Sequence, residues 1–97
     1  MSYDIEIADE EFNITGNVSP MFYAAIPDKG IRAIYGKTGA EAFQILRDMR
    51  TYFEENREAL KRSEPENGWG TWENTLKFIN KMVFASMSHP KEIWEGD

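Results

Sequence analysis

The sequence TGAEAFQILRDMRTYF, residues 38–53, decides the fold because it combines a helix start signal with a long apolar stripe. Thr38 and Glu41 have the spacing of a capping box, in which each side chain pairs with a backbone N–H of the first turn. Apolar residues then recur at helical spacing, at Ala42, Leu46, Met49 and Phe53. The pattern predicts an amphipathic helix that continues to about residue 62 or breaks near Asn56.

Two further segments have helical signatures. Ser19 and Pro20 suit the N-cap and first position of a short, almost wholly apolar helix that ends before Pro27. Thr71 is a candidate N-cap for a last helix that ends near His89. The apolar stripe of that helix consists of Trp72, Leu76, Ile79, Val83 and Met87.

Strand patterns occupy both ends of the chain. Residues 3–7 are apolar at every second position, which predicts a strand with one buried face. The charged run of residues 9–11 ends this strand, and the polar segment 13–17 is typical of a turn. Residues 91–95 suit a short strand that pairs with the first, while residues 31–35 suit either a short strand or a compact loop.

The resulting order of elements, β-α-α-α-β, predicts a single α+β domain over residues 1–97. We expect three to four helices packed on a small sheet of two or three strands. A helical bundle with extended ends is the alternative. With 41% hydrophobic residues, the chain has enough apolar side chains to form a core.

Composition argues against several classes of function. The 17 acidic and 11 basic residues give a net charge of −6, which is unsuited to a surface that coats DNA or RNA. The chain has no cysteine and one histidine, so we expect no metal site, no cofactor and no catalytic triad. No signal peptide and no membrane span is recognisable, which favours a cytoplasmic location. Because no nucleophile–base pair can be named, we expect no catalytic residue and a protein that is not an enzyme.

Three polar loops contain the candidate ligand-binding residues. These are Asn13, Thr15, Asn17 and Ser19 in the first loop, Lys37 and Thr38 in the second, and Asn67, Trp69 and Trp72 in the third. The first loop offers small hydrogen-bonding groups, the second a helix N-terminus beside a cation, and the third an indole that can stack on a planar ligand. Each loop also has a structural interpretation: a turn and cap network, a capped helix start, and an aromatic lid folded on the core.

Charge is unevenly distributed along the chain. Residues 1–30 hold six acidic and one basic residue, whereas residues 31–62 hold five acidic and seven basic residues. The mildly basic middle segment is therefore compatible with a small anionic ligand, although the chain as a whole is acidic.

The segments NITGNVSPM (13–21), GIR (30–32), TGAEA (38–42) and ENGWG (66–70) resemble a family of small bacteriophage and prophage proteins. The resemblance spans about residues 3–85. It implies a phage-borne accessory protein that acts inside a host bacterium, and it carries over no catalytic residue.

Two functional hypotheses follow. The first is a non-catalytic accessory protein that binds and sequesters a small anionic molecule, such as a nucleotide signal of host defence. The alternative is an acidic, protein-binding inhibitor of a host nucleic-acid or defence enzyme, acting through Asp9, Glu10 and Glu11. A homodimer is compatible with either hypothesis, because 13% aromatic residues in a small chain can leave apolar surface to bury between copies.

Overall fold

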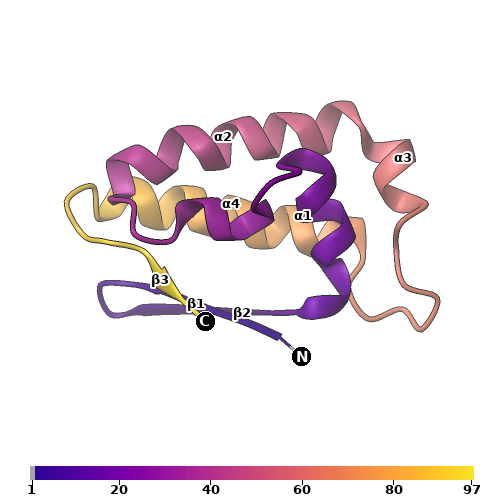
Figure 1. The fold of residues 1–97 in the computed structure, drawn as a ribbon, viewed down its shortest axis with the longest axis horizontal. Helices are drawn as coiled ribbons and strands as arrows, with labels where there is room; N and C mark the ends of the chain where they lie inside the picture. Colours follow the sequence, from indigo (N-terminus) through magenta and orange to yellow (C-terminus); the bar gives the residue numbers. More distant parts are fainter. Residues whose placement is uncertain (1) are drawn as a thin grey trace.

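A three-stranded antiparallel sheet, covered by helices on one face, makes up the computed structural model of residues 2–97 (Figure 1). The elements are β1 (Ser2–Ile7), β2 (Glu10–Thr15), η1 (Gly16–Val18), α1 (Ser19–Ala25), η2 (Gly30–Ile34), α2 (Gly39–Glu55), α3 (Arg57–Lys61), α4 (Trp72–Ser88) and β3 (Glu95–Gly96). The strand order is β2-β1-β3. The predicted α+β class, the number of helices and the small sheet are confirmed.

The hairpin of β1 and β2 differs from the sequence prediction. The turn lies at Ala8, which has a φ of 54°, and the chain then returns as a full strand instead of a polar turn. Phe12 and Ile14 explain the difference, because they alternate with polar residues and pack into the core. The same alternation places Asn13 on the solvent side of the sheet.

The antiparallel helices α2 and α4 form the layer above the sheet (Figure 1). The predicted stripe of α2 is buried in full: Ala42, Leu46, Met49 and Phe53 are at most 1% exposed. Burial of such side chains contributes about 1.5–3 kcal/mol each. In α4 the predicted stripe is buried at Trp72, Ile79 and Val83, whereas Leu76 is only partly buried and Met87 is 57% exposed. At the C-terminal end the buried side of α4 passes through Ser86 instead of Met87.

Helix starts and breaks follow local chemistry. The capping box at Thr38 and Glu41 is present, and Thr71 caps α4 by accepting from the Asn74 N–H. The middle helix breaks at Asn56, whose side-chain Nδ2 donates to the carbonyl of Tyr52. The chain therefore forms two helices there, α2 and α3.

Two shorter segments also differ from their sequence patterns. Ser19 is the first residue of α1, and its hydroxyl donates to the Gly16 carbonyl instead of capping the helix. Residues 31–35 contain no strand: the helix η2 buries Ile31 and Ile34 on one side of a single turn.

The C-terminal segment ties the sheet to the helices. Trp94 is fully buried, and its Nε1 donates to Ser86 Oγ at 2.9 Å. Two backbone bonds join Trp94 to Gly36 and Lys37, just before α2. A C-terminal strand pairs with β1 as expected, but it consists of Glu95–Gly96 and not of residues 91–95. Among the helices of residues 2–97, none has the length and hydropathy needed to cross a membrane.

Candidate ligand-binding site

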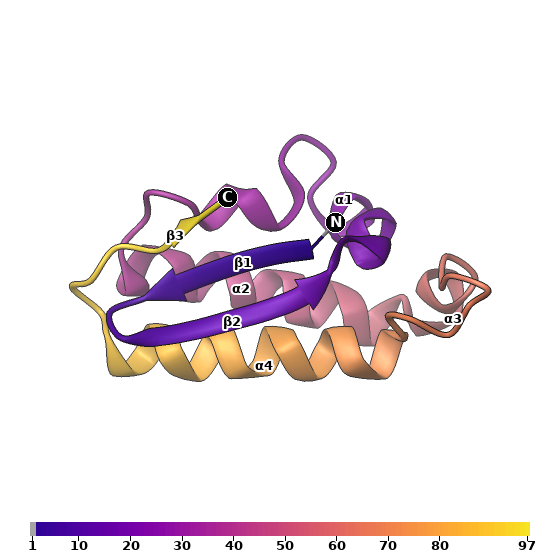
Figure 2. The same ribbon diagram turned by 90° about the horizontal axis from the view of Figure 1, so that it is seen from below.

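Strand β2, at the edge of the sheet, runs beside helix α4 (Figure 2). A shallow groove lies between these two elements. One end of the groove is lined by Ser2, Asn13, Ile14, Thr15, Trp69, Gly70 and Asn74. The other end is lined by Asn13, Ile14, Asn74, Lys77, Phe78 and Lys81. Because the two ends share three residues, they form one continuous surface, which we call the β2–α4 groove.

Trp69 stands at one end of the groove and is 70% exposed. Its backbone N–H donates to Asn67 Oδ1 at 2.9 Å, so the Asn67 side chain is used to shape the loop. Gly68 and Gly70 flank the indole with φ values of 76° and 102°, which favour glycine. The loop thus holds a large apolar ring outside the core, where it is free to contact a ligand.

Gly70 joins the first and third polar loops. A Cβ added at Gly70 would lie 2.6 Å from Val18 Cγ1 and 3.0 Å from Thr15 Cγ2. The backbone of the Trp69 loop therefore packs so closely against the 15–18 segment that no side chain fits at Gly70. This contact fixes Trp69 beside Thr15.

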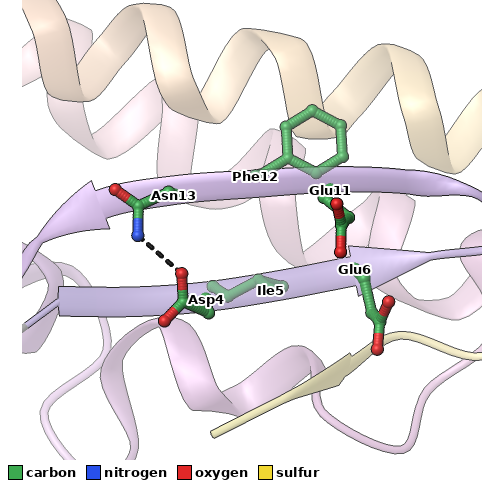
Figure 3. Close-up of a pocket in the computed structure, with 6 residues that line it drawn as sticks. All are labelled: Asp4, Ile5, Glu6, Glu11, Phe12 and Asn13. Atoms are coloured by element: carbon green, nitrogen blue, oxygen red, sulfur yellow. Dashed lines mark hydrogen bonds between the residues drawn. The ribbon is translucent and has the colours of Figure 1, made fainter.

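Asn13 lies in the middle of the groove, on the strand side. Its Nδ2 donates to Asp4 Oδ1 at 2.6 Å (Figure 3) and to the Tyr3 carbonyl at 3.2 Å. These bonds direct the amide NH₂ toward β1, so the side-chain oxygen is the group that Asn13 can offer to a ligand. Thr15 Oγ1 accepts from the backbone N–H of Asn17, which confirms the turn and cap chemistry for this part of the loop.

Lys77 and Lys81 supply the positive charge of the groove, and the sequence analysis did not single them out. Both follow Asn74 at helical spacing, so all three lie on the same side of α4. Glu73 is the acidic neighbour, but its carboxylate pairs with Lys61 at 2.8 Å. Within residues 2–97, neither groove lysine has a carboxylate at ion-pair distance.

Lys37 and Thr38 lie away from the groove. They precede α2, whose first turn packs beside the C-terminal end of α4, whereas Trp69 precedes the N-terminal end of α4 (Figure 1). A helix as long as α4, with 17 residues, separates its ends by about 25 Å. The second polar loop therefore does not share a site with the other two.

The backbone N–H groups at the start of α2 are already paired. Those of Gly39 and Ala40 donate to the carbonyls of Glu92 and Pro90, and that of Glu41 donates to Thr38 Oγ1. The Thr38 N–H donates to Glu41 Oε1, and this bond, with a second from the Thr38 hydroxyl, lowers the pKa of Glu41. An anion at this helix end would have to displace these partners, and it would meet the Glu41 carboxylate.

Four other candidate residues also lie outside the groove, and one of them is Asn67, whose side chain shapes the Trp69 loop. Trp72 is 8% exposed, and its Nε1 donates to the Phe53 carbonyl at 3.1 Å, so its ring belongs to the core. Asn17 and Ser19 line a separate hollow on the other side of the 15–17 segment. The groove therefore contains Asn13, Thr15 and Trp69 of the predicted set.

The solvent face of the sheet has a different character. A hollow of about 280 Å³ is lined there by Asp4, Glu6 and Glu11 together with Ile5, Phe12 and Asn13 (Figure 3). Glu6 faces Glu11 on β2 and Glu95 on β3, so three carboxylates form one row across the sheet. Adjacent Glu10 faces the other way, and its Oε2 lies 2.6 Å from His89 Nε2. Among residues 2–97, no group of three acidic, histidine or cysteine side chains is arranged to hold a metal ion.

Comparisons of the chain with protein-family models, curated proteins and solved structures found no match. The resemblance to small phage proteins therefore stays a prediction from the sequence.

Proposed function

We propose that this chain is a non-catalytic binding protein whose β2–α4 groove takes a small ligand with a flat ring and an anionic group, as in a nucleotide. The observation that carries the proposal is the combination of an exposed indole at one end of the groove with two ammonium groups at the other. Trp69 would stack on the ring, and Lys77 and Lys81 would pair with the phosphates. Asn13 and Asn74 lie between them and would hydrogen-bond to the ligand.

The distribution of charge supports an anionic ligand in this groove. No carboxylate is among the residues that line it, whereas three line the hollow on the sheet face. In a chain of net charge −6, the groove is therefore a surface where an anion meets two lysines, although Asn13 lines both hollows and binds the Asp4 carboxylate on the sheet face. The groove lining offers hydroxyl, amide, ammonium and indole groups but no pair of nucleophile and base, so binding without chemistry is the simplest role.

The biological setting of the proposal comes from the resemblance to phage proteins. We propose that the ligand is a nucleotide signal of host defence and that the protein sequesters it in the cytoplasm of a host bacterium. Isothermal titration calorimetry with AMP, a cyclic dinucleotide and ADP-ribose tests this proposal. Binding of at least one of them, weakened in Trp69→Ala and unchanged in Met87→Ala, is the expected result. No heat with any of the three, or equal binding by both variants, would contradict it.

A second candidate function rests on the carboxylate row Glu11–Glu6–Glu95. Like charges directly opposite each other destabilise a sheet, so this row suits a surface that meets positive charge on a partner. In this alternative the acidic face binds a basic host protein as an inhibitor. Purification of partners from a bacterial lysate at low and high salt tests it, with Glu6→Lys and Glu11→Lys as variants. A partner that both charge reversals retain would contradict the electrostatic mechanism.

A further inference from the structure

A second hollow lies beside the groove, on the other side of the 15–17 segment. Its lining consists of Ser2, Tyr3, Gly16, Asn17, Ser19, Tyr23 and Arg32, and its volume is about 460 Å³. The lining contains hydroxyl, amide and guanidinium groups beside the two tyrosine rings, and none of these residues carries a carboxylate. We call it the Arg32 hollow; it shares only Ser2 with the β2–α4 groove.

Arg32 is held in place by weak contacts, none of them with a side-chain carboxylate of residues 2–97. Its guanidinium carbon lies 5.0 Å from the centre of the Tyr3 ring, at cation–π distance. Nη1 donates to Tyr23 Oη at 3.5 Å, and Nε donates to the main-chain oxygen of Asp97 at 3.4 Å. In the described part of the chain, residues 2–97, no side-chain carboxylate forms an ion pair with Arg32.

The remaining donors of the hollow are compatible with an oxyanion. A guanidinium has five N–H donors, and two of those of Arg32 are used in the contacts above. Because Tyr23 Oη accepts from Arg32, its own proton is free to be donated. Asn17 is exposed and uses its backbone N–H in the turn, so its side-chain NH₂ is a further donor at the rim.

We infer that the Arg32 hollow is a binding site for an oxyanion group, a phosphate or a carboxylate, and that it is separate from the groove of the proposed function. The fork of the guanidinium would bind two oxygens of the anion, and Tyr23 and Asn17 would donate to the others. Tyr3 fixes the guanidinium from below, since its ring is buried and its hydroxyl lies 2.7 Å from Ser19 Oγ.

Titration with inorganic phosphate and, separately, with acetate tests this inference by nuclear magnetic resonance at constant ionic strength. We expect saturable shifts of the Arg32 Nε–H and the Asn17 amide with at least one of the two anions. The two titrations distinguish a phosphate site from a carboxylate site. Shifts that grow linearly without saturation, or that chloride reproduces, would overturn the inference.

Substitutions separate the role of the guanidinium fork from that of net charge. Arg32→Gln should weaken anion binding by about tenfold or more, since hydrogen bonds to charged groups are the strong ones. Arg32→Lys should retain only part of the affinity, because an ammonium group lacks the fork. Arg62→Gln is the matched control, since Arg62 is exposed and lies outside the hollow. Equal affinity in Arg32→Gln and Arg62→Gln would refute the site.

Asn17→Ala is a second variant that removes a donor without touching the packing of Arg32 on Tyr3. We expect a smaller loss of affinity than in Arg32→Gln, with an unchanged melting temperature. This titration does not depend on nucleotide binding. A chain that binds phosphate here but no nucleotide would support the Arg32 hollow and contradict the proposed function.

Discussion

Gly70 and Val18 approach so closely that a single added carbon would not fit between them. A Cβ at Gly70 would lie 2.6 Å from Val18 Cγ1. Val18 is fully buried, so it has little freedom to move aside. This contact fixes the loop that carries the exposed Trp69 to the core beside β2. The position of Trp69 in the β2–α4 groove therefore depends on the contact between Gly70 and Val18.

Gly70→Ala is therefore expected to destabilise the fold and to displace Trp69. The clash adds to the strain of a φ of 102°, for a total cost of roughly 1–3 kcal/mol. Urea denaturation measures the cost, and the emission of Trp69 reports its displacement. Gly68→Ala is the matched control, because Gly68 has a φ of 76° but a Cβ there meets nothing within 4 Å. Equal losses in the two variants would show that the Gly70 contact has no effect.

Tyr35→Phe is expected to leave stability unchanged or to raise it by about 1 kcal/mol. The Tyr35 hydroxyl is buried without a hydrogen-bond partner in the described chain, residues 2–97, and burial without a partner is costly. Thermal and urea unfolding at pH 7 measure the change. A clear loss of stability would mean that the hydroxyl has a partner that the structure lacks.

Because of the same buried hydroxyl, we expect the stability of the wild type and of Tyr35→Phe to depend differently on pH in alkaline solution. Burial raises the pKa of Tyr35 above its ordinary value of 10.0. The folded state then keeps the phenol proton at a pH where the unfolded state has lost it, so this contribution to stability falls as pH rises above the unfolded pKa. Tyr35→Phe removes the group, so its stability should fall less steeply above pH 10 than that of the wild type. If the stability of the wild type and of Tyr35→Phe fell equally steeply with pH, the raised pKa of Tyr35 would be contradicted.

For Glu41 we expect the opposite effect: its contribution to the stability of the fold is lost as pH falls. The hydrogen bonds from Thr38 lower its pKa, so its contribution to stability is present above the unfolded pKa and is lost as pH falls through the folded one. Glu41→Gln should therefore be less stable than the wild type at pH 7, with a smaller difference at pH 3. Glu54→Gln is the matched control, because it removes a carboxylate from an exposed turn of the same helix that takes no part in the capping box. A gap between wild type and Glu41→Gln that is constant with pH would count against the capping box.

The lysines of the groove predict how affinity depends on charge and salt. Lys77→Gln and Lys81→Gln should each weaken nucleotide binding severalfold, and binding by the wild type should fall as ionic strength rises. Lys91→Gln is the control, because Lys91 is exposed and does not line the groove. Calorimetry at two salt concentrations measures both effects. Affinity that is insensitive to both lysines would exclude them from the site.

Much of the fold could be predicted because helix signals are local. The capping box at Thr38 and the stripe from Ala42 to Phe53 identify α2 within a single window. The sequence pattern does not predict β2, because the charged residues Glu10 and Glu11 suggest the end of a strand. Phe12 and Ile14 nevertheless alternate with polar residues, as in a strand. Glu10 is accommodated by a partner 79 residues away, His89, and no local pattern contains that contact.

The site was only partly predictable, because it depends on contacts between residues that are distant in the sequence. Trp69 between two glycines was visible in the sequence as a ring that helix periodicity does not explain. Lys77 and Lys81 read as the polar side of a helix, because only the packing of α4 beside β2 places them in line with Trp69. Conversely, Lys37 and Thr38 suit an anion site by sequence, but the backbone N–H groups of Gly39 and Ala40, which open the helix, already donate to the carbonyls of Glu92 and Pro90.

Chemical-shift mapping with AMP tests the central claim most directly. The account predicts saturable shifts of the Trp69 indole N–H and of the amides of Asn13, Asn74 and Lys77, which surround the β2–α4 groove. Shifts confined to residues 37–41, or no shifts at any nucleotide concentration, would contradict it.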